Sequence, residues 1–184
     1  VNILSILSAR SKTWISAYFN LAKSIEVTAQ NFTRLIAQGT GKKLIDEQID
    51  RPLSPNELKD AYSQIILESF RTGVVTNTNQ PLFALIDKSF GQNGLFAFDS
   101  LIIDYKGNLK ATSRADLILG NLLDSNLEEI YIANPIMNKV RRKEIDTCGT
   151  CDLYDSCGGD RNAAYAEFGD FTARDPGCWK YGTF

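Results

Sequence analysis

The residues of this sequence best suited to chemistry are its four cysteines, Cys148, Cys151, Cys157 and Cys178. The first two form a C-x-x-C pair, whose short loop can put two thiolates on one metal centre, with Gly149 suited to the tight turn. The later two would complete a set of four sulfur ligands. Four thiolates fit either tetrahedral zinc or a [4Fe-4S] cluster, so the spacing alone leaves the metal open.

Two other interpretations of the cysteines carry less weight. Disulfides or unrelated roles are disfavoured because clustered cysteines in a reducing compartment are more often metal ligands. Structural zinc is the stronger alternative, although zinc ribbons usually repeat the C-x-x-C pair, and the second half of this set does not.

The absence of histidine restricts the chemistry further. It excludes His-based general base catalysis, Cys/His nucleophile pairs and every zinc or iron site with a histidine ligand. Any chemistry must therefore use sulfur, carboxylates, Tyr, Lys or a cofactor.

The composition is that of a globular protein, with 184 residues of which 43% are hydrophobic. Twenty basic and 22 acidic side chains give a net charge of -2, which offers no global electrostatic basis for binding nucleic acid or an anionic membrane. No apolar run is long enough for a membrane span, and the first residues, VNILSILS, resemble a strand more than a signal peptide. We therefore expect a cytoplasmic protein with neither nucleic acid nor membrane as partner.

The first third of the chain predicts a strand, a helix and a second strand. Residues 1–8 are short, apolar and β-prone, and residues 13–24 space Trp14, Tyr18 and Leu21 along one helical face. A β-rich run follows and stops near residue 41, so the order is that of a parallel βαβ unit. Because two parallel strands cannot cover their own faces, we expect further strands to come from elsewhere.

A charged linker precedes a well-marked helix. Ser54 and Glu57 have the spacing of a capping box, Pro55 suits the first helical position, and Gly73 is placed to end the helix. The residues that we expect on its buried side are Leu58, Tyr62, Ile65, Ile66 and Phe70.

The remainder predicts a β-hairpin, short helices and a cysteine-rich segment. Residues 96–112 alternate as a hairpin with a turn at 105–108, and Gly120-Asn121 leads towards a helix capped by Ser125. Asn134-Pro135 begins another helix, and residues 162–168 suggest a short one within the cysteine segment, which is otherwise carried on loops.

The cysteine segment closely resembles the C-terminal auxiliary-cluster segment, the SPASM domain, of radical S-adenosylmethionine (SAM) enzymes. Its pattern is C-x2-C-x5-C-G-G, then A-Y-A-x-x-G-D and D-P-G-C. Upstream, residues 101–107 with 119–121 resemble the hairpin of that family, and residues 31–62 resemble its last barrel strand and linker helix. The matching positions in the cysteine segment are Cys148, Cys151, Cys157, Gly158, Gly159, Tyr165, Gly169, Asp170, Asp175, Pro176 and Cys178.

The resemblance covers the whole chain and implies an α/β (α+β) fold. Residues 1–53 would be the end of a partial (β/α) radical SAM barrel, residues 54–92 a linker helix region, and residues 93–184 a small SPASM-like domain with the hairpin and the cysteine loops. On this view Arg34, on the last barrel strand, could face the barrel interior.

The chain departs from the family at a second set of cysteines. Full SPASM domains hold two auxiliary clusters, but residues 93–100 contain no cysteine, and Thr112 and Arg161 occupy two further ligand positions. The resemblance therefore implies one [4Fe-4S] cluster on Cys148, Cys151, Cys157 and Cys178, with zinc as the alternative. Ser113 stands where relatives have an aspartate that can act as a base. We expect Arg161 to form an ion pair in the space left by the missing cysteine.

A further departure concerns SAM cleavage. No cysteine precedes Cys148, so the C-x3-C-x2-C motif of the SAM-binding cluster is missing and this chain alone should not cleave SAM. The resemblance implies the C-terminal portion of an enzyme that matures peptides, proteins or tetrapyrroles, with its cluster serving electron transfer and structure. SAM would bind only in a complete enzyme, and whether this chain by itself is an enzyme stays open.

The alternative is a non-enzymatic iron-sulfur or zinc module that recognises a partner protein or peptide. Expected partners are a separate SAM-binding chain, a peptide or protein substrate, or a second copy joined through an exposed sheet edge.

Overall fold

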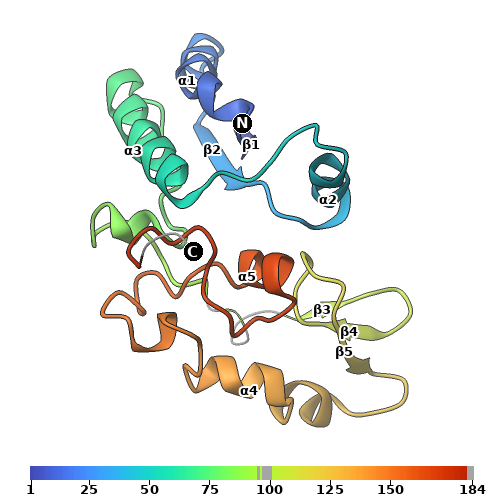
Figure 1. Cartoon of the computed structure of the whole chain (residues 1–184). Coiled ribbons are helices and arrows are strands. Elements are labelled where there is room, and N and C mark those ends of the chain that lie inside the picture. Colours follow the sequence, from blue (N-terminus) through green and yellow to red (C-terminus); the bar gives the residue numbers. More distant parts are fainter. Residues whose placement is uncertain (95, 97–100, 182–184) are drawn as a thin grey trace.

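The computed structural model describes residues 1–94, 96 and 101–181, which form a mixture of helices and two small sheets. In Figure 1 the parallel strands β1 (Asn2–Leu7) and β2 (Ala29–Arg34) lie with α1 (Ile15–Ser24) and α3 (Pro55–Thr72) at one end of the molecule. Helix α4 (Pro135–Arg141) lies at the other end, with α5 (Arg161–Phe168) between them. The predicted mixed class is confirmed.

The predicted strand-helix-strand unit is present. Strands β1 and β2 pair in parallel, from Asn2 opposite Ala29 to Leu7 opposite Arg34. Side chains alternate across the sheet, so Leu7 is buried against the helices whereas Leu4 and Ile6 on the other face are 67% and 56% exposed. One face of this sheet is therefore apolar and open to solvent.

The predicted face of the first helix is wrong. A short 3-10 helix, η1 (Ser11–Trp14), precedes α1, and the buried side chains of α1 are Ile15, Phe19 and Ala22. Trp14 lies before α1 begins and is half exposed, outside its periodicity. Phe19 packs on Phe32 of β2 with ring centroids 5.8 Å apart, so the sheet decides which face is covered.

A helix occupies the region predicted to be a charged linker. Helix α2 (Gly39–Asp46) buries none of its side chains. Leu44 and Ile45 are only partly buried, and the charged residues around them give this segment the composition of a linker.

Helix α3 forms as predicted. Ser54 and Glu57 make both hydrogen bonds of the capping box, and Gly73 ends the helix in the left-handed conformation with φ of 73°. Leu58, Tyr62 and Ile65 are buried as expected. Phe70, expected on the same side, is 78% exposed.

The second sheet is larger than the predicted hairpin. Strands β3 (Ile102–Ile103) and β4 (Asn108–Lys110) are antiparallel as expected, and β5 (Ile118–Asn121) adds a third strand on β4. Residues 97–100 of the predicted hairpin lie outside the described residues. Gly120-Asn121 thus ends a strand and does not lead directly into a helix.

The helices after this sheet follow the prediction in part. The next helical segment is a short π-helix, η3 (Glu128–Ile132). The side chain of Asn126, not that of Ser125, accepts a hydrogen bond from the backbone N–H of Glu129 in this helix. Asn134 caps α4 and Asp160 caps α5, so both of these predicted helices are confirmed. Two 3-10 helices, η2 (Phe83–Leu85) and η4 (Cys148–Thr150), complete the described elements.

Two buried clusters make up the core, and the cysteine segment joins them. The first contains side chains of β1, α1, β2 and α3 together with Leu153 and Cys157. The second contains side chains of β4, η3 and α4 together with Phe171 and Cys148. The cysteine segment therefore lies where the two halves of the molecule meet.

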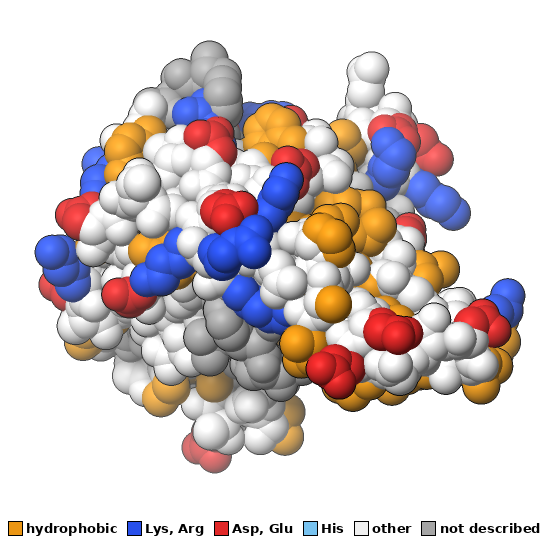
Figure 2. All heavy atoms as spheres, turned by 90° about the horizontal axis from the view of Figure 1, so that it is seen from below, with side chains coloured by type: hydrophobic (Ala, Val, Ile, Leu, Met, Phe, Trp, Pro, Cys, Tyr) orange, Lys and Arg blue, Asp and Glu red, His pale blue; other side chains and the backbone are white. Residues whose placement is uncertain are grey.

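The surface seen from below Figure 1 carries acidic and basic side chains side by side, with apolar ones between them (Figure 2). None of the described helices has the length and apolar character needed to cross a membrane.

Candidate metal centre

All four cysteines line one small cavity, of about 20 Å³, between the two cores. Each is a free thiol; Cys148 and Cys157 are buried, whereas Cys151 and Cys178 are partly exposed. Residues separated by up to thirty positions in the sequence thus converge as the spacing predicted.

Short turns hold the thiols in place. Cys148 begins η4, and the backbone N–H of Cys151 donates to its carbonyl at 3.1 Å, which closes the C-x-x-C knuckle. Gly159 has φ of 68°, and a Cβ there would lie 3.2 Å from Cys148 Sγ and collide with the Arg161 guanidinium. Only glycine lets the backbone pass this close to the sulfur.

Every one of the four sulfurs accepts at least one N–H group. The backbone N–H of Leu82 donates to Cys157 Sγ at 3.2 Å, and Gly159 and Lys180 supply backbone donors to Cys157 and Cys178. Arg161 Nη2 lies 3.6 Å from Cys148 Sγ, and Lys180 Nζ lies 3.6 Å from Cys151 Sγ. Such donors stabilise negative charge on thiolates and are the usual surroundings of iron-sulfur ligands.

Burial acts against ionisation of the free thiols. It raises the pKa of Cys157 and of Cys178, despite the backbone donors. A bound metal reverses this preference because a coordinating thiol is deprotonated outright.

The separation of the four sulfurs bears on which metal group they could hold. Among residues 1–94, 96 and 101–181, no three Cys, Asp or Glu side chains lie close enough to share one metal ion. In a [4Fe-4S] cluster each thiolate binds a different iron, so the sulfurs stand farther apart than around zinc. A [4Fe-4S] cluster is larger than this cavity of about 20 Å³, so binding it would require the cavity to widen.

A buried ion-pair network joins the cysteine segment to the first sheet. The Arg34 guanidinium donates to both carboxylate oxygens of Asp175 at 3.0 Å and lies 3.0 Å from Asp160. Asp175 also accepts the backbone N–H groups of Asp160 and Gly177, so its fully buried carboxylate is completely bonded. Arg34 shares a sheet face with Leu7, so the expectation that it faces the barrel interior is wrong.

The contacts within this network shift the pKa of Asp160 and of Arg34. Burial alone would raise the pKa of Asp160, but the charge and hydrogen bond of Arg34 lower it overall. Burial likewise opposes the charge on Arg34, yet Asp175 and Asp160 raise its pKa well above the usual value. The guanidinium of Arg34 and the carboxylate of Asp160 are therefore both charged at neutral pH.

Within the part of the chain that the structure describes, Arg161 does not form the ion pair that was expected. Its guanidinium donates to the carbonyls of Phe171 at 2.9 Å and Ala173 at 2.6 Å, besides its contact with Cys148. The backbone supplies the acceptors, so the buried cation needs no carboxylate partner.

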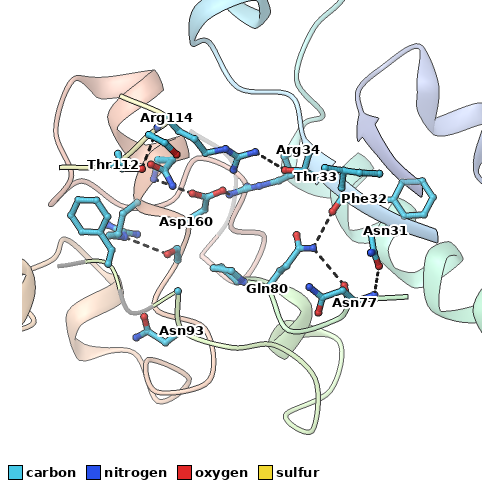
Figure 3. A pocket seen from close by; sticks show the side chains of 18 of the residues that line it. Asn31, Phe32, Thr33, Arg34, Asn77, Gln80, Asn93, Thr112, Arg114 and Asp160 are labelled. Carbon is cyan, nitrogen blue, oxygen red and sulfur yellow. Dashed lines mark hydrogen bonds and ion pairs between the residues drawn. The ribbon is translucent and has the colours of Figure 1, made fainter. Parts of the chain in front are cut away.

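A second, larger cavity of about 500 Å³ lies between β2 and the second sheet (Figure 3). It is lined by residues from many segments that lie far apart in the sequence, and sequence reasoning missed it for that reason. Gln80 donates to the carbonyl of Phe32 at 3.0 Å, and Asn31 accepts the backbone N–H of Asn77 at 2.9 Å. The cluster of amides at residues 77–80 was the one signal available in the sequence.

Comparison with known proteins gives a clear result for structure only. No protein-family model matches the chain, and no curated protein matches it significantly. The solved structure of native anSMEcpe with bound AdoMet is similar, with a TM-score of 0.64 at 17% identity over 98% of this chain and 52% of that one. The chain has the fold of about half of anSMEcpe.

Two further structures of anSMEcpe support the same alignment. Those with AdoMet and the Cp18Cys or Kp18Cys peptide give TM-scores of 0.65 and 0.63 at 16% and 18% identity, again over 98% of this chain and 53% of anSMEcpe. The likeness to anSMEcpe therefore shows a shared fold, over nearly all of this chain and about half of that protein.

Proposed function

We propose that this chain is the C-terminal portion of a radical SAM/SPASM enzyme and binds one auxiliary [4Fe-4S] cluster through Cys148, Cys151, Cys157 and Cys178. The observation that carries the proposal is the convergence of these four thiols on one cavity, with an N–H donor at every sulfur. The fold shared with anSMEcpe supports it.

The cluster has two roles in this proposal. With four protein thiolates it has no open iron for a substrate, so the chemistry that it supplies when bound is electron transfer. The protein residues do the structural work: the cysteine turns tie the core beneath β2 to the core around α4, and ligation stabilises that junction.

The remaining parts of an enzyme would come from other residues. In this proposal residues 1–53 are barrel elements, residues 54–92 a linker region and residues 93–184 the SPASM domain. The open face of β1, with Leu4 and Ile6, would be covered by further barrel strands that also hold the SAM-binding cluster. A peptide substrate, of the kind seen with anSMEcpe, would enter the 500 Å³ cavity beside β2.

Free thiols of this kind survive in a reducing compartment, so the proposal places the protein in the cytoplasm.

The test is metal analysis of protein purified without oxygen. We expect about four irons and four sulfides per chain and an EPR signal after dithionite reduction. Cys151→Ala should abolish the visible absorbance of the cluster, whereas Ser156→Ala, at a nearby partly buried position, should keep it. Full absorbance in the Cys151→Ala protein would contradict the ligand assignment.

A second candidate is a non-enzymatic iron-sulfur or zinc module for partner or peptide recognition. It is favoured by the exposed apolar side chains of β1, Leu4 and Ile6. One zinc per chain without sulfide would put this candidate first, and association of two chains through the β1 edge would support it.

A further inference from the structure

The cavity between β2 and the second sheet has an uneven balance of charge. Arg34 on its wall is already neutralised by Asp160 and Asp175, each 3.0 Å away. Arg161 is committed to backbone carbonyls and to Cys148. Arg34 and Arg161 are therefore held by groups of the protein itself, and the charge of Arg114 also acts on Asp160, the carboxylate that lines the cavity.

Arg114 is different. It is exposed at the cavity and comes from the loop between β4 and β5, and its Nη2 donates to Thr33 Oγ1 of β2 at 2.7 Å. It forms no ion pair with any carboxylate in the described part of the chain, and Asp116, two residues away, pairs with Lys110 at 3.6 Å. Figure 3 shows the Arg114 side chain reaching across to β2.

The uncharged polar side chains of the cavity are suited to hydrogen bonding with a polypeptide backbone. Side-chain amides of Asn31, Asn77, Gln80 and Asn162 line it, and such groups both donate to and accept from peptide backbone. Asn162 Oδ1 is buried, and none of the described residues donates a hydrogen bond to it. A buried acceptor of this kind is satisfied by an N–H group of a ligand.

We propose that this cavity binds a peptide segment carrying a carboxylate, which Arg114 selects while Asn162 accepts a ligand N–H group. The inference rests on the proposed function only in taking the cavity as the substrate site. A guanidinium binds a carboxylate through two parallel hydrogen bonds, which exceed its single bond to the Thr33 hydroxyl. Ligand binding therefore replaces the Arg114–Thr33 bond.

Two sources of the carboxylate are separated by peptide design. The probe is the fluorescein-labelled heptapeptide Gly-Ala-Ser-Asp-Ser-Ala-Gly with an amidated C-terminus, used with the complete chain in anaerobic anisotropy titrations. A second peptide replaces Asp by Asn, and a third is the Asn peptide with a free C-terminal carboxylate. We expect at least one acid-bearing peptide to bind about tenfold more tightly than the neutral one. Whichever peptide does so identifies the source.

Variants assign the selection to Arg114. Arg114→Gln should remove the preference for acid, and Arg114→Glu should favour a Lys-containing counterpart of the probe. Arg142→Gln, an equally exposed arginine at the end of α4, should leave all affinities unchanged. Asn162→Ala should weaken every peptide several-fold without altering the preference.

Several outcomes overturn the inference. They are equal binding of acidic and neutral peptides, an acid preference that survives Arg114→Gln, displacement of the probe by AdoMet alone, or no binding up to millimolar peptide. Unchanged binding by the Asn162→Ala protein removes the role of Asn162. Iron analysis of the same samples tests the proposed cluster separately from the peptide site. Protein that lacks iron but keeps its peptide selectivity would contradict the proposed function and leave this inference standing.

Discussion

The guanidinium of Arg34 on β2 and the carboxylate of Asp175 form two parallel hydrogen bonds of 3.0 Å, although 141 residues separate them in the sequence. Asp175 lies three residues before Cys178 and is fully buried. This pair therefore joins the first sheet directly to the segment that carries the proposed last ligand.

Loss of Arg34 should be strongly destabilising. Arg34→Met leaves the buried carboxylates of Asp175 and Asp160 without their cation, which costs about 3–5 kcal/mol of unfolding free energy. Urea unfolding at neutral pH measures the change. We expect Arg34→Met combined with Asp175→Asn to be less destabilised than the sum of the two single variants.

The control for this prediction is the exposed pair of Arg142 and Glu144, whose nitrogen and oxygen lie 2.6 Å apart. Arg142→Met should change stability by less than about 1 kcal/mol, because solvent screens such pairs. Similar losses for the Arg34 and Arg142 variants would refute the special role of the buried pair.

Gly159 should tolerate no side chain. Its φ of 68° and the approach of Cys148 Sγ and Arg161 leave no room for a Cβ. Gly159→Ala is expected to cost about 1–3 kcal/mol and to lower the iron content of purified protein. Gly94→Ala, where an added Cβ meets no atom within 4 Å, is the matched control and should retain both properties.

Lys180 should tune the proposed cluster. Its ammonium lies 3.6 Å from Cys151 Sγ and favours the more negative, reduced cluster. Lys180→Gln should therefore lower the midpoint potential, by about 60 mV if the lost interaction is worth a tenfold factor for one electron. Anaerobic redox titration measures this shift. A rise in potential, or the same shift in the distant Lys42→Gln protein, would contradict the assignment.

Glu57 should make stability depend on acid pH. Hydrogen bonds from Arg51 and Lys12 hold the pKa of this capping-box carboxylate well below its usual value. A carboxyl group whose pKa is lower in the folded than in the unfolded state stabilises the fold above the unfolded pKa, about 4.3, and loses this effect as pH falls through the folded pKa.

The matching variant is Glu57→Gln. It should cost about 1 kcal/mol at pH 7 and much less at pH 3, where wild-type protein has lost part of the same stabilisation. Urea midpoints at the two pH values make the comparison. An equal cost at both would show that the charge of Glu57 contributes nothing.

Local signals in the sequence were sufficient to predict several helices. The capping box at Ser54 and Glu57, the left-handed Gly73 and the Asn134 cap define α3 and α4, because their partners lie within a few residues. The four cysteines were recognised for a similar reason, since a C-x-x-C knuckle is itself a local structure.

What depends on distant partners was decided only by the tertiary structure. The buried face of α1 is set by Phe32 of β2. Helix α2 buries none of its side chains, and strand β5 requires β4 as its neighbour. The expected ion pair of Arg161 was replaced by carbonyls that only folding brings near. The sequence by itself determined the helix caps and the set of four cysteines. The hydrogen bonds between Arg34 and Asp175 and the cavity beside Arg114 were decided by the tertiary structure, because their groups come together only when segments far apart in the sequence pack against each other.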